Sequence, residues 1–153
     1  MAIPLAEDET GILSAMTHMA DKKPKRALDA LKSIPTDARH KVYALGLRVR
    51  ANVMIGAYDA ASKAVYDWSL EMPSSPQPYR VMGNALAKKG DKRAERWFQR
   101  AINVSGGGSG VVLDYASYLI KLGRTDQARE CLNSLRYVKG RTKRLKQKLL
   151  NAL

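Results

Sequence analysis

The chain of 153 residues is poor in the side chains that carry most enzyme and metal chemistry. Its single cysteine, Cys131, excludes an internal disulfide and a cysteine-based zinc site. Its two histidines, His18 and His40, stand 22 residues apart and have no ligand-like spacing to each other or to carboxylates. We therefore expect no enzyme, no catalytic residue, no metal site and no cofactor, and we expect Cys131 to be partly buried.

Long apolar runs are also missing. No stretch of 18 apolar residues exists, and the first 20 residues hold three acidic side chains but no lysine or arginine. A membrane-spanning helix needs a long apolar run, and a secretory signal peptide needs a positively charged start followed by an apolar core. The chain is therefore predicted to be cytoplasmic. Alternating apolar patterns bounded by hairpin turns are absent too, and no β-strand is expected.

What the sequence does contain is an internal repeat. Four alanines recur at intervals of 34, 33 and 34 residues, namely Ala27, Ala61, Ala94 and Ala128. Each is followed four positions later by a larger apolar residue, and these are Leu31, Val65, Phe98 and Leu132. Three positions further on, the same step is kept by Ile34, Trp68, Ala101 and Leu135. Another phase is marked by Gly56, Gly90 and Gly123. Agreement among these phases predicts a helical repeat.

Each repeat is predicted to hold two amphipathic helices. Apolar residues recur at i, i+3, i+4 and i+7 in two of the first helices, as Ile12, Ala15, Met16, Met19 and as Val112, Tyr115, Ala116, Leu119. Small residues leave room for a facing helix at Gly46, Gly83 and Ala116. Pro24 predicts a helix start, the repeated glycines suit left-handed helix ends, and Thr125 or Asp126 is expected to cap the next helix. Residues 106–110, rich in glycine, are expected to form a turn between repeats.

The pattern resembles the tetratricopeptide repeat, whose signature is Trp-x2-Leu-Gly-x2-Tyr on one helix and Ala-x3-Phe, then Pro, on and after the next. In the third repeat the matching residues are Tyr79, Met82, Gly83, Leu86, Ala94 and Phe98. The first repeat matches least, and its second helix is expected to end early at Pro35. The resemblance implies one all-α domain over residues 1–153, with antiparallel helix pairs stacked in a right-handed solenoid. Its repeats would span about 10–38, 39–75, 76–108 and 109–140, with a capping helix over about 141–153.

Charge is the unusual feature of the composition. Lysine and arginine number 27 against 14 aspartates and glutamates, a net charge of +13. The excess is uneven, with +5 over residues 76–108 and +6 over residues 139–153, which contain no acidic residue. A field of this sign attracts acidic peptides, nucleic-acid phosphates or anionic lipid and does not choose among them. A solvated face that keeps the chain in solution is the plainer alternative.

The resemblance also implies where a partner would bind. In tetratricopeptide arrays the first helix of each repeat lines a concave groove, and some members use basic and amide side chains there to hold a partner's terminal carboxylates. The residues of this chain at such positions, called the predicted groove residues below, are Arg80, Asn84, Lys88, Ser117, Lys121, Arg144 and Lys148. Asp114 departs from that pattern, because it stands where the family has an asparagine. An aspartate at this position is expected to repel a partner's carboxylate.

These observations predict a non-catalytic scaffold that binds a peptide or helical segment of another protein, and charge complementarity predicts that this segment is acidic. The alternative is RNA binding through the basic third repeat and the C-terminal helix, with cations on phosphates and aromatic rings on bases. The sequence lacks a regular base-reading pair in each repeat and has few aromatics outside the core phases, which favours the protein-binding interpretation.

Overall fold

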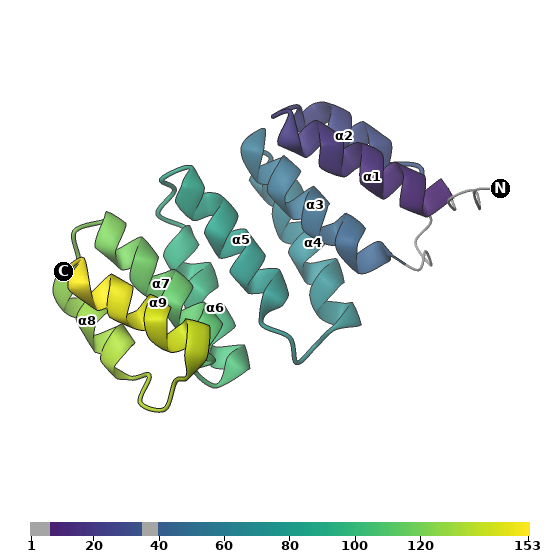
Figure 1. Ribbon diagram of the computed structural model, residues 1–153. Coiled ribbons are helices and arrows are strands. Elements are labelled where there is room, and N and C mark those ends of the chain that lie inside the picture. Colours follow the sequence, from purple (N-terminus) through teal and green to yellow (C-terminus); the bar gives the residue numbers. More distant parts are fainter. Residues whose placement is uncertain (1–6, 35–39) are drawn as a thin grey trace. The chain divides into compact units, whose positions relative to one another are not determined.

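The computed structural model describes residues 7–34 and 40–153, and over these residues the chain forms nine α-helices and no strand (Figure 1). The chain divides into two compact units, Met1–Pro73 and Ser74–Leu153. The helices of the first unit are α1 (Glu7–Ala20), α2 (Pro24–Leu31), α3 (Lys41–Met54) and α4 (Tyr58–Glu71). Those of the second unit are α5 (Gln77–Lys88), α6 (Ala94–Ser105), α7 (Ser109–Lys121), α8 (Thr125–Asn133) and α9 (Gly140–Asn151). The all-α prediction is confirmed for this part of the chain.

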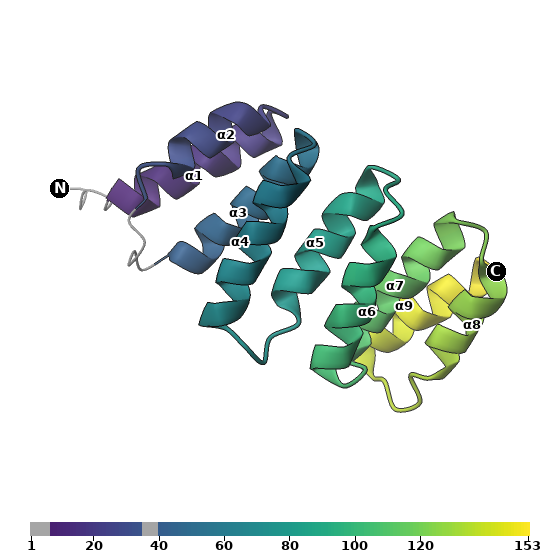
Figure 2. The same ribbon diagram turned by 180° about the vertical axis from the view of Figure 1, so that it is seen from behind.

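Consecutive helices pack as antiparallel pairs, which are α1 with α2, α3 with α4, α5 with α6 and α7 with α8. In the first unit, α3 also contacts α1 and α2. In the second unit, α7 contacts α5, α6 and α9, so it is the central helix of that unit. Helix α6 passes behind α7 in Figure 1 and in front of it in Figure 2. Helix α7 contacts both α5 and α9, so these three helices are neighbours in the second unit.

The repeat phases form the cores of both units, as predicted. The four recurrent alanines have no exposed surface, and the larger residues four positions later are buried with them. The third set, from Ile34 to Leu135, is buried as well. Because apolar burial is the main favourable term in folding, these positions hold each helix against its partner.

Close approach within a pair depends on glycine. A β-carbon placed on Gly83 would lie 3.0 Å from two ring carbons of Phe98. Phe98 has no exposed surface, and its ring centroid lies 6.0 Å from that of Tyr115 and 5.5 Å from that of Tyr118. Small and large residues therefore interlock between α5 and α6, as the sequence predicts.

The glycines at helix ends are also confirmed. Gly56, Gly90 and Gly123 have φ values of +78°, +70° and +75°, in the left-handed region where glycine carries no Cβ penalty. The predicted cap on α8 is wrong. Helix α8 begins at Thr125, so Thr125 and Asp126 lie inside its first turn, and the residue at the cap position makes no side-chain cap. The acidic side chain of Asp126 in this turn still interacts favourably with the positive end of the helix dipole.

One expectation for the first repeat is wrong, and another falls outside the described residues. Ile12 and Ala15 are buried and Met19 packs against the same cluster, but the Met16 side chain is 51% exposed. The apolar stripe of α1 is narrower than predicted, because among the described helices of this unit α1 packs on α2 and α3 but not on α4. Pro35 lies outside the described residues, and α2 ends before it, at Leu31. None of the helices within residues 7–34 and 40–153 is long and apolar enough to cross a membrane.

Candidate functional site

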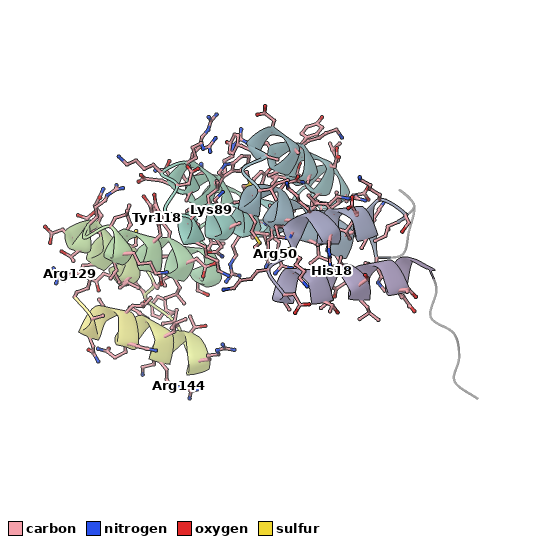
Figure 3. All side chains as sticks on the ribbon, turned by 90° about the horizontal axis from the view of Figure 1, so that it is seen from above. His18, Arg50, Lys89, Tyr118, Arg129 and Arg144 are labelled. Atoms are coloured by element: carbon pink, nitrogen blue, oxygen red, sulfur yellow. The ribbon has the colours of Figure 1, made fainter. Side chains whose placement is uncertain are left out.

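The predicted groove residues lie on α5, α7 and α9 of the second unit. Arg80, Asn84 and Lys88 follow one another at four-residue steps along α5, so they occupy one stripe of that helix. Ser117 is half-buried and Lys121 exposed on α7, and Arg144 and Lys148 are both exposed on α9. Figure 3 shows Arg144 on the side of α9 that faces away from the other helices of its unit.

Arg80 and Asn84 both bind the carboxylate of Asp114. The Nε of Arg80 donates a hydrogen bond to Oδ2 of Asp114, and Nδ2 of Asn84 donates to the same oxygen at 2.8 Å. The side chains of Arg80 and Asp114 are 31% and 23% exposed, so the pair is partly accessible to water. The two donors belong to α5 and the acceptor to α7, and the cluster therefore joins the first helices of two consecutive pairs.

Gly110 makes room for this cluster. A β-carbon there would lie 3.1 Å from Nη1 of Arg80. Since Gly110 precedes Asp114 by one turn on α7, the guanidinium lies along α7 between the start of that helix and Asp114. Residues 106–108 form the turn between α6 and α7, whereas Ser109 and Gly110 already belong to the first turn of α7, where Gly110 admits the Arg80 side chain.

From the sequence, Asp114 was expected only to depart from a family pattern, and its pairing with Arg80 and Asn84 was not predicted. A signal for the pairing was present, because Arg80 and Asp114 are 34 residues apart, which is one repeat. Residues separated by one repeat occupy equivalent positions on neighbouring first helices. Opposite charges at such positions are expected to meet.

The lysines among the predicted groove residues lie at helix ends. Lys88, Lys121 and Lys148 stand in the last turns of α5, α7 and α9, where a cation interacts favourably with the negative end of the helix dipole. Ser117 and Lys121 follow Asp114 at three and seven residues, which keeps them on its stripe of α7. Among the described residues, Lys88, Lys121, Arg144 and Lys148 have no carboxylate partner, so their charges are available to another molecule.

Positive charge is concentrated in the second unit. Ser74–Leu153 carries 17 lysines and arginines against 5 acidic residues, a net +12, whereas Met1–Pro73 carries 10 against 9, a net +1. Four of the five acidic side chains of the second unit pair with arginine, as Asp91–Arg93, Glu95–Arg124, Asp114–Arg80 and Asp126–Arg129. The uncompensated charge of this unit is therefore almost entirely cationic.

A second polar cluster joins α6, α7 and the residue before α8. The carboxylate of Glu95 accepts two hydrogen bonds from the Arg124 guanidinium, both 2.9 Å, and one from the Tyr115 hydroxyl at 2.8 Å. The hydrogen bonds from Arg124 lower the pKa of Glu95, and those same bonds raise the pKa of Arg124. Burial, with the neighbouring Glu95 carboxylate, raises the pKa of Tyr115 to about 12. This arrangement fixes helix positions and leaves no group poised for proton transfer near neutral pH.

Cys131 is half-buried as expected, and burial raises the pKa of its thiol, which disfavours the reactive thiolate. Nε2 of His40 lies 3.3 Å from the carboxylate of Glu9. Over the part of the chain that the structure describes, no three histidine, cysteine, aspartate or glutamate side chains group as metal ligands would.

The first unit holds an open cavity of about 240 Å³ that sequence reasoning did not find. Its apolar lining comes from Ile34, Ala44, Leu45 and Leu70. Its charged lining groups are engaged within the chain: Lys41 pairs with Glu71 at 2.8 Å, Asp67 pairs with Lys63, and Arg48 donates to the carbonyl of Leu31 at 2.8 Å. A cavity of this kind depends on side-chain packing between helices, so no repeat or motif could have revealed it. We assign no ligand to it.

Comparison of the sequence with known protein families and with curated proteins found no match. The resemblance to tetratricopeptide repeats therefore depends on the residues and helix pairs described above.

Proposed function

We propose that the chain is a tetratricopeptide-like helical array, in which the stacked pairs form a right-handed solenoid. The support is the coincidence of the repeat phases with the buried positions of each helix pair, together with the motif residues of the third repeat. The cytoplasmic location predicted from the sequence stays a prediction.

We propose further that the second unit is a non-catalytic binding module for an acidic segment of a partner protein. One observation carries the proposal: a unit of net charge +12 presents unpaired cations on α5, α7 and α9, while four of its five carboxylates are bound by arginine. An extended or helical acidic peptide lying across these helices would meet Lys88, Lys121 and Lys148 in turn.

The expected binding is salt-sensitive. A single exposed ion pair contributes about 0–1 kcal/mol, so several must act together to hold a peptide. Complementary charge at this kind of surface governs the rate of encounter and the choice of partner more than the affinity. Screening over about 8 Å at physiological ionic strength limits the attraction to a peptide already near the surface.

The test is a fluorescence titration of the full chain with a labelled glutamate-rich peptide, with the equivalent glutamine peptide as the control ligand. Lys88→Glu with Lys121→Glu should weaken binding by roughly ten- to a hundredfold, because it replaces two attractions by two repulsions. Arg80 is left intact, since a carboxylate there would face Asp114.

The matched control variant is Arg96→Glu with Arg129→Glu. Both are exposed and belong to α6 and α8, and the change in net charge is the same; the contact of Arg129 with Asp126 that it breaks is exposed and 3.5 Å long. We expect this variant to change the affinity at physiological salt by only a few-fold at most. An affinity for the glutamate-rich peptide that the Lys88 and Lys121 substitutions leave unchanged would rule out the proposed module. An equal affinity of the wild-type chain for the glutamine peptide would rule it out as well.

RNA binding is the second candidate, and one observation favours it. The cations of this unit also cover α6, where the Arg100 guanidinium lies 5.5 Å from the ring centroid of Trp97 and 6.0 Å from that of Tyr79. A phosphate-driven binder would use both sets of cations, and each one removed would reduce the salt slope by about one unit. Equal losses from the two double variants with single-stranded RNA, together with a steep salt dependence, would favour this candidate over peptide binding.

A further inference from the structure

Arg80 and Asn84 have the composition and spacing of an anion-binding site. They stand one turn apart on α5, and both donate to a single oxygen, Oδ2 of Asp114. The described contacts give Arg80 no acceptor for its two terminal Nη groups and give Oδ1 of Asp114 no donor. The site therefore holds its carboxylate by one oxygen only, without the bidentate geometry that makes arginine–carboxylate pairs strong.

We propose that Asp114 is an internal competitor: it occupies the anion site of Arg80 and Asn84 and thereby reduces the affinity of this surface for a partner's carboxylates. The inference rests on the proposed function, since the ligand it concerns is an acidic peptide. Asp114 would then help to determine which acidic peptides bind, a role that the net charge of the unit does not reveal.

Three features of the geometry support competition over a purely structural ion pair. The pair is partly exposed, so an incoming carboxylate can reach it. The described contacts show no protein acceptor for the Nη groups of Arg80, which therefore offer a place where such a carboxylate first binds before it displaces Asp114. The pair also lies on the stripes of α5 and α7 that end in Lys88 and Lys121, so a peptide held by these lysines would run past it.

The experiment compares the wild-type chain with Asp114→Asn and Asp114→Ala. Asparagine keeps the size of the side chain without its charge. Alanine removes the carboxylate altogether, and its high helix propensity suits a position inside α7. The matched control is Asp126→Asn, which changes the net charge equally but neutralises a carboxylate whose side chain is 95% exposed on α8. Circular dichroism and thermal melting establish that each variant is folded.

Acetate is the first probe, because it tests the site without any peptide. In ¹⁵N NMR titrations against sodium chloride at equal ionic strength, acetate should shift the Arg80 Nε–H and Asn84 amide signals saturably in both Asp114 variants. Wild type and Asp126→Asn should require about tenfold more acetate, and adding Arg80→Gln to Asp114→Ala should abolish the response. Equal responses of the Asp114 and Asp126 variants would mean that only net charge matters and would overturn the inference.

The glutamate-rich peptide is the second probe. Asp114→Ala should bind it about tenfold more tightly than Asp126→Asn, and Arg80→Gln should remove that gain. Acetate binding without any peptide binding would uphold the anion site and refute the proposed peptide module. Peptide binding that depends on Lys88 and Lys121 but not on Asp114, with no acetate response, would uphold the module and refute the competitor.

Discussion

At the residue scale, Glu95 joins α6 to α7 through Tyr115 and to the residue before α8 through Arg124, and the cluster sets a pH dependence. The pKa of Glu95 is lowered in the folded chain, so its contribution to stability is present above its ordinary value of 4.5 and is lost as the pH falls through the lowered value. The pKa of Tyr115 is raised from 10.0 to about 12, so its contribution is present below pH 10 and is lost between pH 10 and about 12.

Tyr115→Phe should therefore weaken the alkaline loss of stability. Phenylalanine cannot ionise, and the free energy of unfolding should fall less steeply between pH 10 and about 12 than in the wild-type chain. Tyr118, whose pKa burial also raises, is kept in the variant and retains part of the loss. The measurement is urea unfolding followed by circular dichroism across this range. Tyr43→Phe, at a side chain 69% exposed, is the control and should leave the slope unchanged; a Tyr115 variant with the wild-type slope would contradict the assignment.

Residue-scale features were the hardest to predict from the sequence. The groove positions came from a family resemblance that names positions, and such a pattern does not say which side chains of the same chain will satisfy one another. Asp114 was expected to repel a ligand, yet it is the partner of Arg80 and Asn84. The pairing depends on the registration of α5 against α7, which only the packed unit fixes.

At the element scale, the helix pairs followed from the sequence, because burial requires an apolar stripe on every helix. The alanine phases mark where the second helix of each pair approaches the first, and all four alanines are buried. Caps and stripe widths were less predictable. Thr125 lies within α8 and Met16 faces water, because a helix start and the edge of a stripe depend on neighbours outside the local pattern.

Glycine within the pairs gives a prediction at this scale. Gly83→Ala should destabilise the second unit by about 1–2 kcal/mol, because the new β-carbon would press on Phe98, and Phe98 is held by two tyrosine rings and cannot retreat. Gly46→Ala is the matched control, since its β-carbon would lie 3.4 Å from the Trp68 ring, an ordinary contact. There the gain in helix propensity, up to about 1 kcal/mol, should make the change neutral or stabilising.

Denaturant unfolding of both glycine variants checks this pair of expectations. The difference between the two variants is the informative quantity, because both gain the same helix propensity and differ only in the space around the new methyl group. Equal changes in unfolding free energy would mean that Phe98 yields and that the close approach of α5 and α6 is not tight.

At the scale of the whole molecule, charge divides the chain more sharply than composition suggests. The net +13 belongs almost entirely to Ser74–Leu153, and within that unit the arginines that pair with carboxylates serve the fold. The lysines in the last turns of α5, α7 and α9 belong to the remainder. The sequence revealed the uneven charge but not which cations are free, because pairing is a property of the packed helices.

This division predicts a separation between association and dissociation rates for the acidic peptide. Arg96→Glu with Arg129→Glu lowers the positive field of the second unit without touching the predicted groove residues, so it should slow association a few-fold at low salt and leave the dissociation rate unchanged. Lys88→Glu with Lys121→Glu should slow association and also speed dissociation, because it removes contacts made in the bound state. Stopped-flow mixing measures both rates.

At about 1 M salt, where screening acts within about 3 Å, the association rates of the Arg96→Glu with Arg129→Glu variant and the wild-type chain should converge. A dissociation rate that responds equally to both variants would mean that the peptide has no preferred side of the unit, and the cations of α5, α7 and α9 would then act only through their summed charge.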